Sequence, residues 1–259
     1  MFKVSIALIH NNNSIRNDLI KPALLLLSSY LSDYYSTNYF EILFQVDVKP
    51  VSSDFFSWRR SLFYQVALEW LQHTERPLTL SPFNQPITDS NLRSAAIELI
   101  LTDKHMRAWD YFLESSDDFL ICFEDDCTFN DNSLDRVGKL LSHCTSLCND
   151  DGLYADLAGG FSIDALGVGK LISHLSNDFL YFKRPVTNTA CAYLINRKFA
   201  NDCKNILISH PNYRLLPADW LINKFFIELS RSSGQVTCFH SFPPIFTHGS
   251  IAAKQSTVR

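Results

Sequence analysis

Apolar and polar residues follow two periods along this chain, and the order of the periods predicts alternating strands and helices. Residues 3–10 form a short apolar run typical of a buried strand. The polar residues 11–19 are expected to form a turn, and a helix is expected over 20–35. A second strand is predicted over 39–48. Together these segments form a β-α-β unit, which favours parallel pairing of its strands.

The rest of the chain continues the alternation. The clearest helical period covers 92–115 and is followed directly by the apolar strand 119–123. Further helices are expected over 57–73, 133–148, 197–209 and 218–232, and strands within 153–161, 183–195 and 234–240. The pattern predicts a single α/β domain over 1–259, with a mostly parallel central sheet flanked by helices. The stretch 75–91 contains three prolines and is expected to be a loop.

Three consecutive acids follow the strand 119–123. Glu124, Asp125 and Asp126 would lie beyond its carboxyl end, where open α/β sheets bind their ligands. If the backbone stays extended, Glu124 and Asp126 point the same way. Carboxylates in this position suit a hard divalent cation that also contacts substrate phosphates. A solvated acidic turn is the alternative.

Composition limits the class of protein. Of the 259 residues, 46% are hydrophobic and the net charge is -4, which fits a soluble globular core and gives no overall attraction to nucleic acid. The seven cysteines form no CxxC pair, so small buried thiols in a reducing compartment are expected. No signal peptide or membrane-length apolar stretch is visible, which favours a cytoplasmic location and leaves room for peripheral membrane contact.

Several motifs, in order, resemble one enzyme family. They are "LIHNNNSIR" with Arg16, "AIELILTDKHMRAWDYF" with His105 and Trp109, "FLICFEDDCTF", "YADLAGG", "NTACAYLINRKFA", "LPADWLIN" and "PPIFTHGS". Together they resemble glycosyltransferase family 25, the lipopolysaccharide-type galactosyltransferases with a GT-A-like fold. The resemblance spans nearly the whole chain.

The resemblance implies a metal-dependent enzyme that uses a nucleotide sugar. Asp126 would hold the metal, Mn²⁺ or Mg²⁺, with Glu124 and His248 as further ligands. Glu124, Asp125 and Asp156 would contact the donor. An ordinary loop histidine is the alternative for His248.

Acceptor and catalytic roles fall on later segments. Asp219 is the candidate general base that takes the proton of the acceptor hydroxyl, and Trp220 is a candidate platform for the acceptor sugar. A helix N-cap is the alternative for Asp219. The tail 243–259 is expected to close over the site, with Lys254 near the leaving diphosphate.

The resemblance therefore implies an inverting hexosyltransferase. It would move a sugar, galactose by default, from a UDP-sugar to a saccharide or lipid-linked saccharide of a bacterial surface glycan such as lipooligosaccharide or O-antigen. Two alternatives remain open. One is a metal-dependent phosphohydrolase or nucleotidyltransferase, and the other is a non-catalytic carbohydrate-binding protein.

Overall fold

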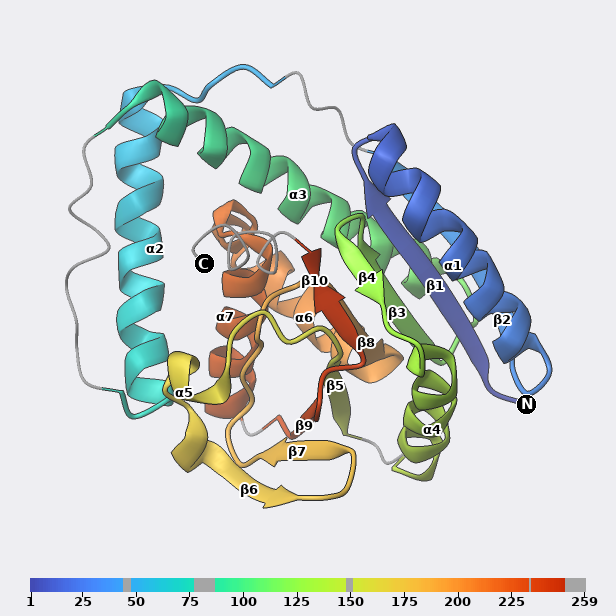
Figure 1. Cartoon of the computed structure of the whole chain (residues 1–259). Coiled ribbons are helices and arrows are strands. Elements are labelled where there is room, and N and C mark those ends of the chain that lie inside the picture. The colour runs from blue at the N-terminus through green and yellow to red at the C-terminus, as the bar shows by residue number, and fades with distance from the viewer. Residues whose placement is uncertain (44–47, 77–86, 148–150, 233, 250–259) are drawn as a thin grey trace.

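A central sheet organises the chain (Figure 1). The computed structural model describes residues 1–43, 48–76, 87–147, 151–232 and 234–249. The sheet has eight strands in the order β2-β1-β3-β8-β5-β9-β7-β6. Their bounds are β1 Lys3–His10, β2 Ser36–Leu43, β3 Phe119–Glu124, β5 Gly152–Asp156, β6 Ile172–Leu175, β7 Phe179–Phe182, β8 Ala192–Asn196 and β9 Val236–Ser241. A separate ladder joins β4 (Cys127–Phe129) to β10 (Phe246–His248).

Helices cover both faces of the sheet. They are α1 Ser14–Ser32, α2 Ser53–His73, α3 Asp89–Glu114, α4 Ser133–Ser146, α5 Ile163–Leu166, α6 Arg197–Ser209 and α7 Ala218–Arg231, with 3₁₀ helices at Gly169–Leu171 and Pro211–Leu215. In Figure 1, α1 and α4 lie on one side of the central strands, and α3, α6 and α7 on the other. The predicted α/β class is therefore confirmed.

Side-chain alternation along the strands produces two cores. In β3, Phe119, Ile121 and Phe123 pack with the apolar residues of α1 and α4. Leu120 and Cys122 face the opposite way and pack with α3, α6 and α7. Because successive side chains of a strand point to opposite faces, the next residue of the α3 side is Glu124. The Glu124 carboxylate therefore lies on the side of the sheet that α3 covers.

The prediction of a mostly parallel sheet is wrong. The pairings β1–β2, β1–β3 and β5–β9 are parallel, whereas β3–β8, β5–β8, β7–β9 and β6–β7 are antiparallel. Strand β8 enters the middle of the sheet in the opposite direction and separates the parallel pair β1–β3 from β5. A fully buried apolar run shows that a strand is central, but its periodicity does not encode its direction.

Two local predictions at the start of the chain need correction. The polar stretch 11–19 is not a turn throughout, because α1 already begins at Ser14. The side chain of Asn13 accepts a hydrogen bond from the backbone N–H of Arg16 and caps the helix. The strand expected over 39–48 is found as Ser36–Leu43, and residues 44–47 lie outside the described residues. The strand at Lys3–His10 and the helix at Arg197–Ser209 are confirmed.

The remaining expectations concern composition and loops. The six cysteines that the described ranges contain are free and buried, as expected. No helix within those ranges is long and apolar enough to cross a membrane. Residues 77–86 of the proline-containing loop and residues 250–259 of the tail lie outside the described residues. The expected closure of the tail over the site therefore stays a prediction.

Candidate functional site

Each of the three acids at the end of β3 lies close to a different nitrogen-bearing side chain. The Glu124 carboxylate lies 3.1 Å from His105 Nε2, and Asp125 lies 2.8 Å from Arg16 Nη1. Asp126 Oδ2 lies 3.4 Å from His248 Nδ1. Positive charge on His105 of α3 and Arg16 of α1 therefore offsets part of the repulsion among the three carboxylates.

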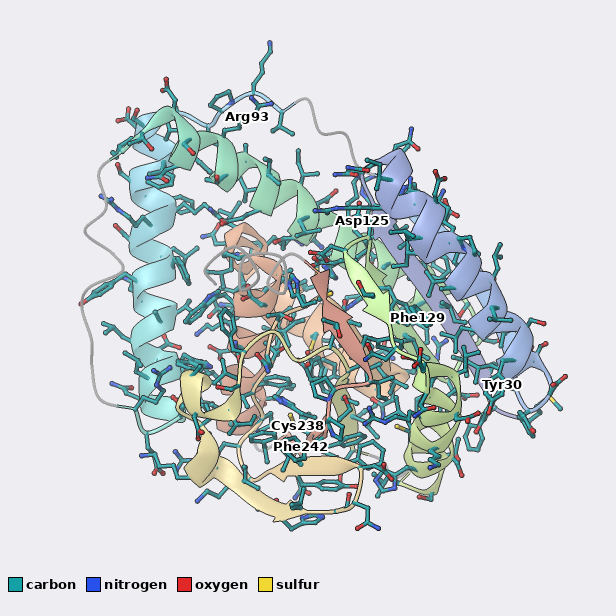
Figure 2. The ribbon with its side chains drawn as sticks, viewed as in Figure 1. Tyr30, Arg93, Asp125, Phe129, Cys238 and Phe242 are labelled. Carbon is teal, nitrogen blue, oxygen red and sulfur yellow. The ribbon has the colours of Figure 1, made fainter. Side chains whose placement is uncertain are left out.

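The backbone geometry explains why the acids diverge. Strand β3 ends at Glu124, and Asp125 and Asp126 form the turn into β4. The expectation that Glu124 and Asp126 point the same way assumed extended backbone, so it is wrong here. Asp125 is buried, and its second oxygen accepts a hydrogen bond from the backbone N–H of Asn11 at 3.2 Å. Figure 2 shows Asp125 at the end of the sheet where α1 begins.

Glu124 is tied to a buried network on α3. His105 Nδ1 lies 2.9 Å from the Tyr193 hydroxyl, which also accepts a 2.8 Å hydrogen bond from Trp109 Nε1. Burial lowers the pKa of His105, but hydrogen bonds and charges from Cys122 and Glu124 outweigh it and raise the pKa to about 9. His105 and Trp109, four residues apart, share a helix face and together hold Tyr193 of β8 against α3.

Asp126 belongs to a second group of ligand-type atoms. Donor atoms of Asp126, Cys191 and His248 all lie within 4.8 Å of one another. The Cys191 thiol donates to Asp126 Oδ1 at 3.5 Å. Nδ1 of His248 is buried and has no hydrogen-bond partner among the described residues. An imidazole nitrogen, a carboxylate and a sulfur in this arrangement fit a divalent transition-metal ion.

The ladder of β4 and β10 brings His248 to Asp126. The two strands are antiparallel, and His248 pairs with Cys127, the residue after Asp126. The next residue, Gly249, donates its backbone N–H to the Asp126 carbonyl at 2.8 Å. A Cβ at Gly249 would lie 2.6 Å from that oxygen, so only glycine fits without a shift. Gly249 therefore lets the backbone after β10 approach Asp126 closely.

A small cavity of about 230 Å³ opens beside the acids. Its polar wall holds Arg16, Asn11 and the three acids, and its apolar wall is formed by Ile9, Val48, Ile97, Ile100 and Leu101. An apolar slot next to carboxylates and a guanidinium suits a flat ring that carries charged oxygens.

A larger cavity of about 560 Å³ lies between α2, α3, α5 and α7. Asp219 and Trp220, the predicted base and acceptor platform, both line it. Trp220 makes edge-on ring contacts with Phe63, at 4.7 Å between centroids, and with Trp70, at 5.6 Å. The two cavities share no lining residue, and α3 contributes to both.

Asp219 is not the N-cap of α7. Pro217 occupies that position, and Asp219 lies in the first turn, where its Oδ1 accepts from the backbone N–H of Trp220 at 2.9 Å. Burial, together with the charges of Glu124 and Glu98, raises the pKa of Asp219 to about 6. Of the three acids beside the small cavity, Glu124 contributes to the raised pKa of Asp219 in the large cavity.

Asp156, predicted to contact the donor, lies at the end of β5. It is buried and appears in the lining of neither cavity. Its Oδ2 accepts from the backbone N–H of Asn188 at 2.8 Å and from the Thr187 hydroxyl at 3.1 Å. Thr189, which follows, has a φ of 103°, in the region that disfavours a β-branched residue. Asp156 therefore fixes a strained segment that forms one wall of the large cavity.

Sequence reasoning missed two residues of these sites. Cys191 precedes β8 and carried no spacing signal, because its partners come from distant segments. Arg59 lies on α2 in a pattern that indicates an ordinary amphipathic helix, yet it is buried against the large cavity. Lys254 lies outside the described residues, so its role stays a prediction.

Comparisons with known proteins give no assignment. No protein-family model matches the chain, and no curated protein matches it significantly. We therefore infer function from the geometry of the two cavities and of the acids that line the smaller one.

Proposed function

We propose that this protein is a divalent-metal-dependent glycosyltransferase that moves a sugar from a nucleoside diphosphate sugar to an acceptor hydroxyl. One observation chiefly supports this proposal. The small cavity is lined by three acids and Arg16, the large cavity is lined by aromatic residues and Asp219, and the charge of Glu124 contributes to the raised pKa of Asp219. A transferase of this kind needs both compartments, because donor and acceptor must meet at one carbon atom.

The small cavity would take the nucleotide end of the donor. Its apolar wall suits a base, and Arg16 would contribute positive charge near the ribose or the diphosphate. Asp125 positions Arg16 through their ion pair. The GT-A-like resemblance favours UDP as the nucleotide and galactose as the sugar, with a bacterial surface glycan as the acceptor.

Asp126 and His248 would hold the cation, with Cys191 as a third donor. The buried His248 Nδ1 that lacks a hydrogen-bond partner supports this assignment. When bound, a divalent ion would neutralise charge on the departing diphosphate, and the imidazole and thiol donors favour Mn²⁺ over Mg²⁺. Glu124, predicted as a further ligand, is instead paired with His105 and would act on the site through its charge.

Asp219 would act as the general base. With a pKa of about 6 the carboxylate is ionised at neutral pH and basic enough to accept a proton from a hydroxyl as bonding begins. The acceptor oxygen would attack the anomeric carbon, the bond from that carbon to the diphosphate oxygen would break, and the hydroxyl proton would pass to Asp219. A single displacement of this kind inverts the anomeric configuration. Trp220 would present its ring to the acceptor sugar.

Product analysis separates this proposal from the two alternatives. The protein is incubated with a panel of UDP-sugars and Mn²⁺, without acceptor, and the products are identified by mass spectrometry. We expect slow release of UDP and free sugar, because water replaces the acceptor. Release of UMP and sugar phosphate would indicate a phosphohydrolase or nucleotidyltransferase, and no turnover at all would favour a binding protein.

A pair of variants assigns the base. Asp219→Asn should lower UDP release at pH 8 by at least about a hundredfold, the usual contribution of a general base. Asp18→Asn, at an exposed position of α1, is the matched control and should keep the wild-type rate. Equal rates in all three proteins would remove Asp219 from the mechanism.

A further inference from the structure

The large cavity carries more positive than negative charge. Three arginines line it, namely Arg59, Arg60 and Arg76, together with two carboxylates, Glu98 and Asp219. Arg60 lies over the ring of Phe56 and Arg76 over that of Trp70, so both guanidinium groups face aromatic walls of the cavity. A cavity that received only neutral sugars would have no evident use for these charges.

Arg59 is fixed in place and retains an unused donor. Only 6% of the residue is exposed. Its Nε donates to the Leu215 carbonyl at 2.6 Å, and its Nη1 donates to Glu98 at 2.8 Å. Nη2 is buried and has no hydrogen-bond partner among the described residues. Two anchored nitrogens hold the guanidinium plane rigid, which suits it to recognise an oxyanion.

Trp70 provides a second unused donor on the same cavity. Its indole Nε1 is also buried without a hydrogen-bond partner in the part of the chain that the structure describes. Buried donors of this kind are rare in folded proteins, because each loses its hydrogen bond to water. Two of them, on residues that line one cavity, indicate a ligand that brings acceptor oxygens.

We propose that the large cavity binds an anionic saccharide, whose carboxylate or phosphate accepts hydrogen bonds from Arg59 and Trp70. This inference rests on the proposed function, in which this cavity receives the acceptor. The anion would be distinct from the donor diphosphate, because none of the proposed metal ligands, Asp126, Cys191 and His248, lines the large cavity. The ring of Trp220 would cover the sugar face while the arginine holds the charged group.

Binding of matched sugars by the full-length chain tests the inference. The probes are methyl β-D-glucuronide, glucose 6-phosphate and the neutral methyl β-D-glucoside, and Kd values are measured by saturation-transfer NMR. We expect at least one charged probe to bind about tenfold more tightly than the neutral one, as a charge-assisted hydrogen bond predicts. The charged probe with the lower Kd shows whether the cavity prefers a carboxylate or a phosphate. Equal Kd values for all three probes would overturn the inference.

Variants locate the effect. Arg59→Gln should lower the charged-to-neutral preference several-fold, since Arg60 and Arg76 remain, and Trp70→Phe should weaken binding of the charged probe several-fold while an aromatic ring is kept. The control is Arg93→Gln, an exposed position at the beginning of α3 labelled in Figure 2, and it should keep the preference. Loss of the preference in Arg93→Gln, or an unchanged preference in folded Arg59→Gln and Trp70→Phe, would contradict the assignment.

A parallel titration with UDP and Mn²⁺ distinguishes failure of the anionic-acceptor inference from failure of the transferase proposal. If UDP binds but the charged sugars show no preference, the anionic acceptor is wrong and the transferase proposal stands. If charged sugars are preferred but UDP does not bind, the acceptor assignment falls together with the transferase proposal.

Discussion

The protonated state of His105 should make the stability of the protein depend on pH. The imidazole is 1% exposed and lies 3.1 Å from the Glu124 carboxylate. Its pKa of about 9 in the native state exceeds the ordinary value of 6.5 that applies to the unfolded chain. The native state therefore binds a proton more tightly than the unfolded state does.

The sign and size of the effect follow from this difference. Below pH 6.5 both states carry the proton, so the stabilisation is fully present; between pH 6.5 and about 9 it is progressively lost. A shift of this size corresponds to about 3 kcal/mol of unfolding free energy. Urea denaturation of wild type and His105→Gln at a series of pH values measures it. The wild type should lose its advantage over the variant by about that amount as the pH rises from 6.5 to 9.

A control histidine isolates the effect. His174→Gln, at an exposed position of β6, should follow the wild-type pH dependence. If the stability difference between wild type and His105→Gln stays constant over this pH range, His105 is neutral in the native protein. The pairing of Glu124 with a cation on α3 would then be refuted.

Three further changes test other parts of the site. The UDP-release rate should rise with pH through about 6, because Asp219 accepts a proton only when ionised, and a pH–rate profile without this limb would contradict its role. Gly249→Ala should weaken Mn²⁺ binding measured by calorimetry, because its Cβ would displace the Asp126 carbonyl; unchanged affinity would show that the ladder does not position the ligands. Asp156→Ala should lower the unfolding free energy by about 3 kcal/mol in urea denaturation, because buried donors such as the Asn188 N–H lose their acceptor; a loss below about 0.5 kcal/mol would refute this.

The sequence predicted the acidic end of β3 well, because a run of five apolar residues that ends in three acids is a strong local signal. It also paired Asp126 with His248, although only through the family resemblance. The ladder that joins them could not be predicted, since β4 and β10 have three residues each, too few to show a period. The direction of β8 was missed for a related reason, because a buried run looks the same in either direction.

Of the residues that line the large cavity, the sequence singled out only Asp219 and Trp220 as candidates for function. Asp219 and Trp220 stood out as an acidic and an aromatic residue at the start of a helix. Arg59 and Trp70 did not, because arginines and aromatic residues are ordinary on an amphipathic helix. Arg59 becomes a candidate only in the folded chain, where Glu98 of α3 and the carbonyl of Leu215 bind its guanidinium and one nitrogen is left without a hydrogen-bond partner among the described residues. Such a contact joins segments 156 positions apart, and a local pattern carries no record of it.

Calorimetric titration of UDP, with and without Mn²⁺, tests the central claim most directly. We expect wild type to bind UDP at least about tenfold more tightly when Mn²⁺ is present. Asp126→Asn should lose this enhancement, and Asp131→Asn, at an exposed position just after β4, should keep it. Metal-dependent UDP binding that disappears only in Asp126→Asn is the predicted result. Absence of UDP binding, or an enhancement that survives in Asp126→Asn, would contradict a nucleotide-sugar site at these acids.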